Sequence, residues 1–325
     1  MDLMPSADQR DLRAGLRAWL ADAWDAERLR AAAAVPAPPF DRKAWKALAD
    51  LGVLGLTLSE EDGGMGLGLA DAVLVFEELG RALVPGPLVG TFLAAGLVPG
   101  AAEGDAVVAV VDTGEAVAVV EHPEAATDVL VLDDSGVYLL APGDVAGPPA
   151  AHPLDPLTPV APAASIRLDG ARRVGDAADA ARLRRFGRIL TAALQVGVAQ
   201  GALDLAVRYA GERVQFDRVI GSFQSVKHLL AEALVRVDLA RPAVLVAALT
   251  VDDPGSGDPG EAAATAKLLA DAAASGNGRT GVQVHGGMGF TWEVLAHLYV
   301  KRAWVQETAF GTAAALAEEL AAGIG

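Results

Sequence analysis

The chain has 325 residues, enough to bury a large core and to divide into more than one domain. A hydrophobic fraction of 52% excludes a disordered chain, and a net charge of −16 argues against nucleic acid or an anionic membrane as a partner. No apolar run is long enough to span a bilayer, and the absence of cysteine excludes disulfides, thiolate nucleophiles and cysteine-based metal sites, so we predict a cytoplasmic protein without a metal centre.

The distribution of proline divides the chain into three regions. Eleven of the 18 prolines lie between Pro85 and Pro162, and none lies between residues 163 and 241. Because proline interrupts helices, the long proline-free stretches favour helices and the middle does not. We predict an α+β fold with an N-terminal helical domain over residues 1–100, a small β domain over 101–175 and a C-terminal helical bundle over 176–325.

The first region has the apolar spacing of helices. Leu12, Leu16 and Leu20 recur on one helical face, which predicts a helix over residues 8–20. Asp41 is placed to cap a second helix that stops at Gly52. A glycine-rich turn over residues 60–68 then leads into a helix over 72–79.

The middle region changes to short runs of β-branched residues, separated by Asp, Gly and Pro. Such runs predict the strands of a small antiparallel sheet. They cover residues 106–111, 116–120, 128–132 and 136–140, with a last strand over 165–169.

The final region has long Ala/Leu-rich stretches that predict helices. These cover residues 177–213, 222–249 and 261–274, followed by one or two helices from residue 292 onward. Pro242 is predicted to kink the second of them.

Four motifs occur in a fixed order along these regions. The first is GVLGLTLSEEDGGMGL at residues 52–67 with FEELGRA at 76–82, the second RVQFDRVIGSFQ at 213–224, the third QVHGGMG at 283–289 and the fourth Gly311-Thr312. Together they resemble the signatures of the acyl-CoA dehydrogenase family, flavoenzymes that oxidise the Cα–Cβ bond of acyl thioesters. The resemblance implies an α domain, a small β domain and a C-terminal four-helix bundle.

The resemblance also implies a set of FAD contacts. Arg213 is expected to bind the pyrophosphate, for which a guanidinium fork and backbone N–H groups are suited, and Phe216 to pack near the adenosine end. The other residues of this ADP-binding half, which the family donates in trans to a neighbouring subunit, are Gln224, Gln283, Gly286 and Gly287. Thr312 is a possible hydroxyl contact to the chain's own flavin. Asp217 departs from the pattern, because glycine usually follows that phenylalanine.

Other parts of the family's site are missing from the sequence. The loop Thr/Ser-Glu-Pro-Gly-x-Gly-Ser-Asp, which holds the flavin ring, has no counterpart between residues 84 and 175; the nearest segment, 141–147, lacks the hydroxyls. The two positions at which family members carry the catalytic glutamate hold Phe310 and Gly187. Glu307, one helical turn before Phe310, is the nearest substitute base, and burial would have to raise its pKa. A surface glutamate is the alternative interpretation.

Three functions therefore stay open. The first is a base-lacking partner subunit that lends its ADP-binding half to a second acyl-CoA dehydrogenase chain, as in the α2β2 members that degrade bulky acyl groups such as steroid side chains. The second is a self-sufficient homotetrameric enzyme for acyl-CoA substrates with Glu307 as a relocated base. The third is a helical binding protein without enzymatic activity.

Overall fold

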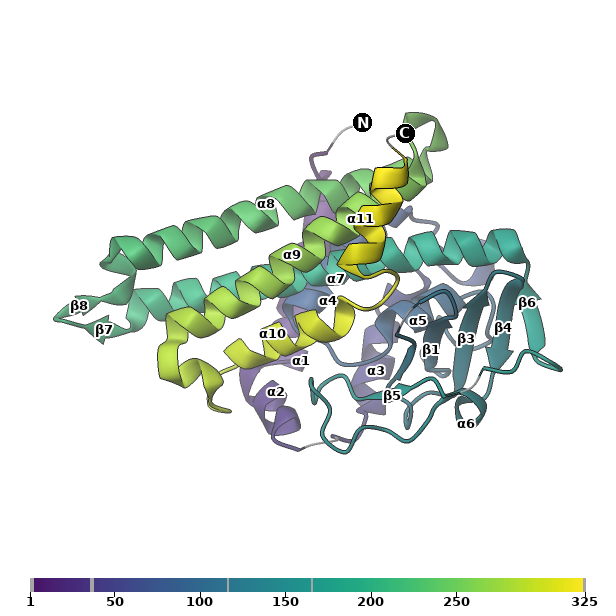
Figure 1. Ribbon diagram of the computed structural model, residues 1–325, viewed down its shortest axis with the longest axis horizontal. Helices are drawn as coiled ribbons and strands as arrows, with labels where there is room; N and C mark the ends of the chain where they lie inside the picture. The colour runs from purple at the N-terminus through teal and green to yellow at the C-terminus, as the bar shows by residue number, and fades with distance from the viewer. Residues whose placement is uncertain (1–2, 36–37, 116, 165, 324–325) are drawn as a thin grey trace.

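The computed structural model describes residues 3–35, 38–115, 117–164 and 166–323 of the chain. It confirms the predicted α+β class: helices come first, then a small sheet, then a bundle of long helices (Figure 1). The domain boundaries at residues 100 and 175 stay a prediction.

The N-terminal helices begin where polar side chains can cap them. They are α1 (Ala7–Ala23), α2 (Ala26–Ala33), α3 (Arg42–Ala49), α4 (Leu69–Arg81) and α5 (Leu88–Ala94). Ser6 forms a capping box with Gln9 at α1. At α3 the Asp41 carboxylate accepts the Ala44 N–H, which confirms the predicted cap. Helices α2 and α5 were not predicted, because seven or eight residues are too few to give a clear apolar period.

The central sheet is mixed, so the prediction of an antiparallel sheet is wrong. The strands are β1 (Val108–Asp112), β2 (Val119–Glu121), β3 (Asp128–Asp133), β4 (Gly136–Leu140), β5 (Val160–Pro162) and β6 (Arg172–Gly175). The main sheet has the order β1-β3-β4-β6, with β1 parallel to β3, because β2 leaves this sheet and pairs with β5. Apolar alternation along a strand carries no information on pairing direction. The last strand also lies later than predicted: residues 166–169 are not a strand, and residue 165 is outside the described residues.

The C-terminal bundle is built around one central helix. Its elements are α7 (Ala177–Glu212), α8 (Gln224–Asp252), α9 (Pro259–His285), α10 (Ala296–Gln306) and α11 (Ala313–Ala322). Helix α7 packs against α4, α8, α9 and α10 (Figure 1). The expectation that no apolar run could span a bilayer is wrong for this helix, which is long and apolar enough to do so, but 83% of that apolar window is buried inside the fold. Helix α7 is therefore the core of the bundle.

Helix α9 runs eleven residues beyond its predicted end, through a glycine-rich stretch that resembles a loop. The amide of buried Asn277 explains this, because it donates to the carbonyls of Ala199 and Ala233 and so ties α9 to α7 and α8. Glycine also allows close packing: a Cβ on Gly278 would lie 2.7 Å from the Cα of Val300 in α10. Helix α8 continues through Pro242.

The N-terminal helices are anchored to the bundle through α4. A Cβ on Gly80 would lie 2.1 Å from the carbonyl oxygen of Leu194, and one on Gly197 would lie 2.0 Å from that of Glu77, so the two helix backbones nearly touch. Asp252, at the end of α8, accepts the N–H groups of Leu69 and Ala70 at the start of α4. These contacts fix α4 relative to α7 and α8.

Candidate functional site

The first candidate surface is the free end of the bundle, which we call the bundle tip and define as residues 213–224 and 283–290. Here α7 turns through the hairpin β7 (Val214–Gln215) and β8 (Arg218–Val219) into α8, and α9 enters the turn η5 (Gly286–Phe290) (Figure 1). The rings of His285 and Tyr209 stack at 4.2 Å, and Val284 packs with Ile220 in one apolar cluster. The two motifs, about 60 residues apart in sequence, therefore meet at one end of the molecule.

The hairpin holds its turn residues in an unusual backbone conformation. Phe216 and Asp217 are the two residues between the paired strands, and both have positive φ angles, 53° and 63°. Two residues with positive φ in a two-residue loop form a type I′ turn, for which Asn-Gly is the preferred sequence. Glycine is therefore favoured at the second position, and Asp can adopt the same left-handed conformation. An aromatic residue at the first position is strained, and its side chain is 84% exposed. Strain and exposure of this kind are typical of a functional contact.

Several polar groups of the bundle tip remain available to a molecule outside the chain. Among the described residues, the side chains of Arg213, Gln224 and Gln283 make no hydrogen bond or ion pair, and all three are exposed. Gly286 and Gly287 are exposed and border open space, and Gly286 has a φ of 59°. A free guanidinium, two free amides, an exposed aromatic ring and an open glycine backbone fit the ADP half of FAD.

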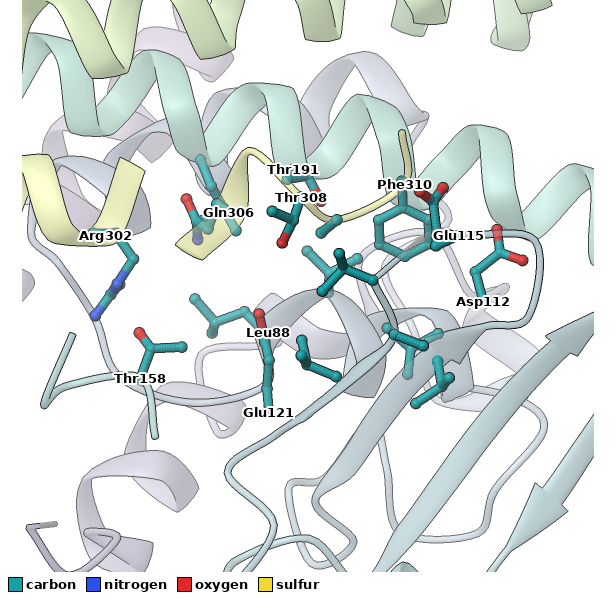
Figure 2. Close-up of a pocket in the computed structure, with 18 of the residues that line it drawn as sticks. Leu88, Asp112, Glu115, Glu121, Thr158, Thr191, Arg302, Gln306, Thr308 and Phe310 are labelled. Atoms are coloured by element: carbon teal, nitrogen blue, oxygen red, sulfur yellow. The ribbon is translucent and has the colours of Figure 1, made fainter. Parts of the chain in front are cut away.

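The second candidate surface is a cavity between α5, the strands β1 and β2, and the end of α10, which we call the inner cavity (Figure 2). Its polar lining includes Asp112, Glu115, Glu121, Thr158, Thr191, Arg302, Gln306 and Thr308. Its apolar lining includes Val84, Leu88, Val89, Val110, Leu194 and Phe310. The space measures about 60 Å³, which holds a few water molecules.

The two positions of the missing base are in direct contact inside this cavity. A Cβ added to Gly187 would lie 2.3 Å from the ring of Phe310, so the aromatic ring packs on the bare backbone of α7. Phe310 is buried and has a φ of 57°, and Arg188 donates to its carbonyl oxygen at 3.0 Å. A carboxylate is therefore absent from both positions, and the ring fills the space between them.

The loop next to the cavity also differs from a flavin-binding loop. The segment 141–147 forms the short helix α6 (Pro142–Val145), and none of its residues lines the inner cavity. The lining comes instead from the segment after β1, which contributes Glu115, Val117 and Ala118. With the Phe310 ring in place and three acidic side chains in the wall, the residues present do not fit a tricyclic flavin ring.

The acidic side chains of the inner cavity are perturbed by their surroundings. Burial raises the pKa of the half-buried Glu121 to about 7, and Asp155 adds to this rise while Arg302 opposes it. Burial, followed by the Asp112 carboxylate, also raises the pKa of Glu115. These acids were not predicted as site residues. The signal that could have found them is a carboxylate at or just after the end of an apolar strand.

Replacement of Glu121 by Gln is expected to change the pH dependence of stability. Because folding raises the pKa of Glu121, its protonated form favours the fold at low pH, and this advantage is lost as the pH rises from about 4.5 to about 7. Above pH 7 the variant should be more stable than the wild type by up to about 3 kcal/mol, and near pH 4 the two should be alike. Urea denaturation from pH 4 to 8 measures this; parallel curves over that range would contradict it.

The remaining predicted residues lie apart from the bundle tip. Glu307 caps the end of α10 and is not among the residues that line the inner cavity, so its role as a base stays a prediction. Thr312 caps α11, where its hydroxyl accepts the Ala315 N–H, two residues after Phe310.

The bundle tip and the inner cavity lie at different places along α7. From Gly187 to Glu212 the helix rises about 38 Å, at 1.5 Å per residue. One flavin dinucleotide does not reach from Phe310 to Arg213 of the same chain. The bundle tip and the inner cavity are therefore too far apart to hold the two ends of one flavin dinucleotide.

Comparison with known proteins identifies the family of both helical regions. Residues 6–101 match the model of the acyl-CoA dehydrogenase N-terminal domain and residues 180–325 that of the C-terminal domain, while the sheet lies between the two matches. The acyl-CoA dehydrogenase IpdE2 of Mycobacterium tuberculosis is 39% identical over 272 residues, which cover 81% of each chain. FadE34 of the same organism is 32% identical over 92% of this chain and 42% of its own length.

A solved structure gives the same result for the fold. The ChsE4–ChsE5 complex from Mycobacterium tuberculosis contains a chain that superposes with a TM-score of 0.82 at 26% identity, covering 100% of this chain and 99% of that one. On these matches, this chain belongs to the acyl-CoA dehydrogenase family, FAD-dependent oxidoreductases that act on CH–CH bonds.

Proposed function

We propose that this chain is the base-lacking partner subunit of a heteromeric acyl-CoA dehydrogenase. The observation that carries the proposal is the contact between Phe310 and Gly187, which removes the base from both family positions and fills the space. The bundle tip, in contrast, keeps its cofactor-binding residues with their polar groups free. The chain has lost one half of the site and kept the other.

The division of labour follows from this. FAD, when bound between the subunits, accepts a hydride from the β carbon of the acyl-CoA. In this chain Arg213 would bind the pyrophosphate, Gln224 and Gln283 would complete the ADP-binding half, and Phe216 would pack near the adenosine end. The second subunit supplies the base and the surface for the flavin ring, and the assembly is an α2β2 heterotetramer.

Two further features support the proposal. The similar mycobacterial structure is itself a complex of two chains, ChsE4 and ChsE5. This chain has no cysteine and so needs no oxidising compartment, which is consistent with a cytoplasmic subunit.

The test is to produce the chain alone and together with an acyl-CoA dehydrogenase encoded beside it. Alone, the protein should be colourless and inactive toward acyl-CoA with a dye as electron acceptor. Together, the two chains should elute as one yellow, active complex with one FAD per pair. A yellow, active oligomer of this chain alone would refute the proposal.

One variant in each subunit shows which of the two subunits carries the catalytic site. Phe310→Leu in this chain should leave the turnover of the complex unchanged, because no reaction occurs beside it. Replacement of the partner's catalytic glutamate by glutamine should abolish turnover. A large loss of activity in Phe310→Leu, with the complex intact, would instead place a working site in this chain.

A further inference from the structure

A second and larger cavity lies behind the wall of the inner cavity, between α2, the start of α3 and the loops of the sheet. We call it the outer cavity. It measures about 310 Å³, within the range of small-molecule sites. The side chains that characterise it are Trp24, Leu29, Phe40, Trp45, His122 and Leu157.

A single layer of chain separates the two cavities. Sequence neighbours line opposite sides of this layer: Glu121 borders the inner cavity and His122 the outer one, and Thr158 and Pro159 are divided in the same way. The wall is fixed by buried Arg302, which donates to Asp155 at 2.6 Å and to the Val84 carbonyl oxygen at 3.1 Å. The outer cavity is thus a separate, built space.

The outer cavity favours an uncharged molecule with an apolar body. The Phe40 ring lies 5.4 Å from Trp45 and 5.7 Å from His122, so aromatic faces form much of the lining. The charged groups among its lining residues, Arg28 and Asp41, are paired with each other, and Arg28 also lies over the Trp24 ring. An ion entering the cavity would lose its hydration without gaining a free counter-charge.

Three hydrogen-bond donors of the lining have no partner among the described residues. Gly86 donates to His122 Nε2 at 3.0 Å, and burial lowers the pKa of His122 to about 3, so the ring is neutral and its proton lies on Nδ1. No described residue accepts from this Nδ1–H. The Nε1–H groups of Trp24 and Trp45 are also without a partner in the described chain, and both are buried. A buried donor without an acceptor is costly, and a ligand oxygen would remove that cost.

We propose that the outer cavity is a binding site for an uncharged apolar molecule that carries a carbonyl oxygen, of the class of cyclic ketones and esters. The aromatic walls take up the hydrocarbon body, and the carbonyl accepts from His122 Nδ1–H. The site is independent of the flavin and of the partner subunit, so it stands whether or not the chain is the base-lacking subunit.

The test uses the bicyclic ketone 2-decalone and its isostere 2-methylenedecalin, which has the same shape but no oxygen. Binding to the full chain is followed by tryptophan fluorescence and by the ¹⁵N shift of the His122 ring. The ketone should bind about fivefold more tightly, as expected for one net hydrogen bond, and should shift the Nδ1 resonance. In His122→Phe the two compounds should bind equally. A wild type that binds neither compound, or a ketone preference that persists in His122→Phe, would overturn the proposal.

A second variant keeps the test valid if His122→Phe does not fold. Ala32 lines the outer cavity from α2, and Ala32→Leu adds bulk to the space. The variant should bind both compounds at least tenfold more weakly than the wild type does. This change corresponds to about the free energy of one apolar contact. Ala14→Leu, on the exposed surface of α1, is the control and should bind like the wild type. Unchanged binding in Ala32→Leu would place the compounds elsewhere and refute the site.

Discussion

Arg213→Ala is expected to lower the affinity of the assembled complex for FAD by about 10- to 100-fold. A hydrogen bond to a charged group contributes about 1.5–3 kcal/mol, and each 1.4 kcal/mol is a tenfold change in affinity. Because the Arg213 side chain makes no hydrogen bond or ion pair within the described residues, its removal breaks no such interaction inside the chain. The effect should therefore appear in cofactor binding and not in folding. The measurement is the FAD dissociation constant of the co-expressed complex, obtained by calorimetry after flavin removal.

Two further variants make this experiment specific. Arg213→Lys keeps the charge but loses the bidentate fork, so it should recover only part of the affinity. Arg172→Ala removes the same charge from the exposed strand β6 and should bind FAD like the wild type. Equal FAD affinity in Arg213→Ala and wild-type complexes would show that the bundle tip does not hold the pyrophosphate.

Lys267→Met is expected to destabilise the chain by about 3–5 kcal/mol, the largest stability change that we predict. Lys267 is fully buried in α9 and forms an ion pair with Asp271, one turn later. Burial raises the pKa of Asp271 to about 6 and lowers that of Lys267. Gln195 donates to both Asp271 and the Ala303 carbonyl oxygen at 3.0 Å, so this network joins α9 to α7 and α10.

The double variant Lys267→Met/Asp271→Leu tests the physical reason. The single change leaves a buried carboxylate without its cation, whereas the double change removes both charges and should recover most of the lost stability. Lys43→Met, at an exposed position of α3, should change the stability by less than about 0.5 kcal/mol. Urea denaturation of the purified chains measures all three. A single variant as stable as the wild type, or a double variant no better than the single one, contradicts the prediction.

Sequence patterns predicted the helices and strands that are determined by residues close together in the chain. The helix around Leu16 and the helix capped by Asp41 follow from apolar period and capping, and the β-branched runs gave β3 and β4 nearly to the residue. The direction of β1 relative to β3 could not be predicted, because it depends on where β2 finds a partner. The length of α9 could not be predicted either, since the buried Asn277 and its carbonyl partners belong to three different helices.

The candidate site divides in the same way. The bundle-tip residues could be named from motifs because each motif is a continuous segment. Glu115 and Glu121, two acids of the inner cavity, were not predicted because the elements that bury them and raise their pKa values are distant in sequence. The outer cavity was not predicted for the same reason: Trp24, Phe40 and His122 share no pattern in sequence.

The contact between Phe310 and Gly187 also constrains how this chain can evolve. An acidic side chain at residue 187 would begin with its Cβ 2.3 Å from the Phe310 ring, so it could arise only after the aromatic residue had been lost. An acid at residue 310 would join a cavity that already raises the pKa of two carboxyl groups. Each single step back toward a base is thus destabilising on its own. On the function that we propose, recovery of a base at either position would therefore require more than one substitution.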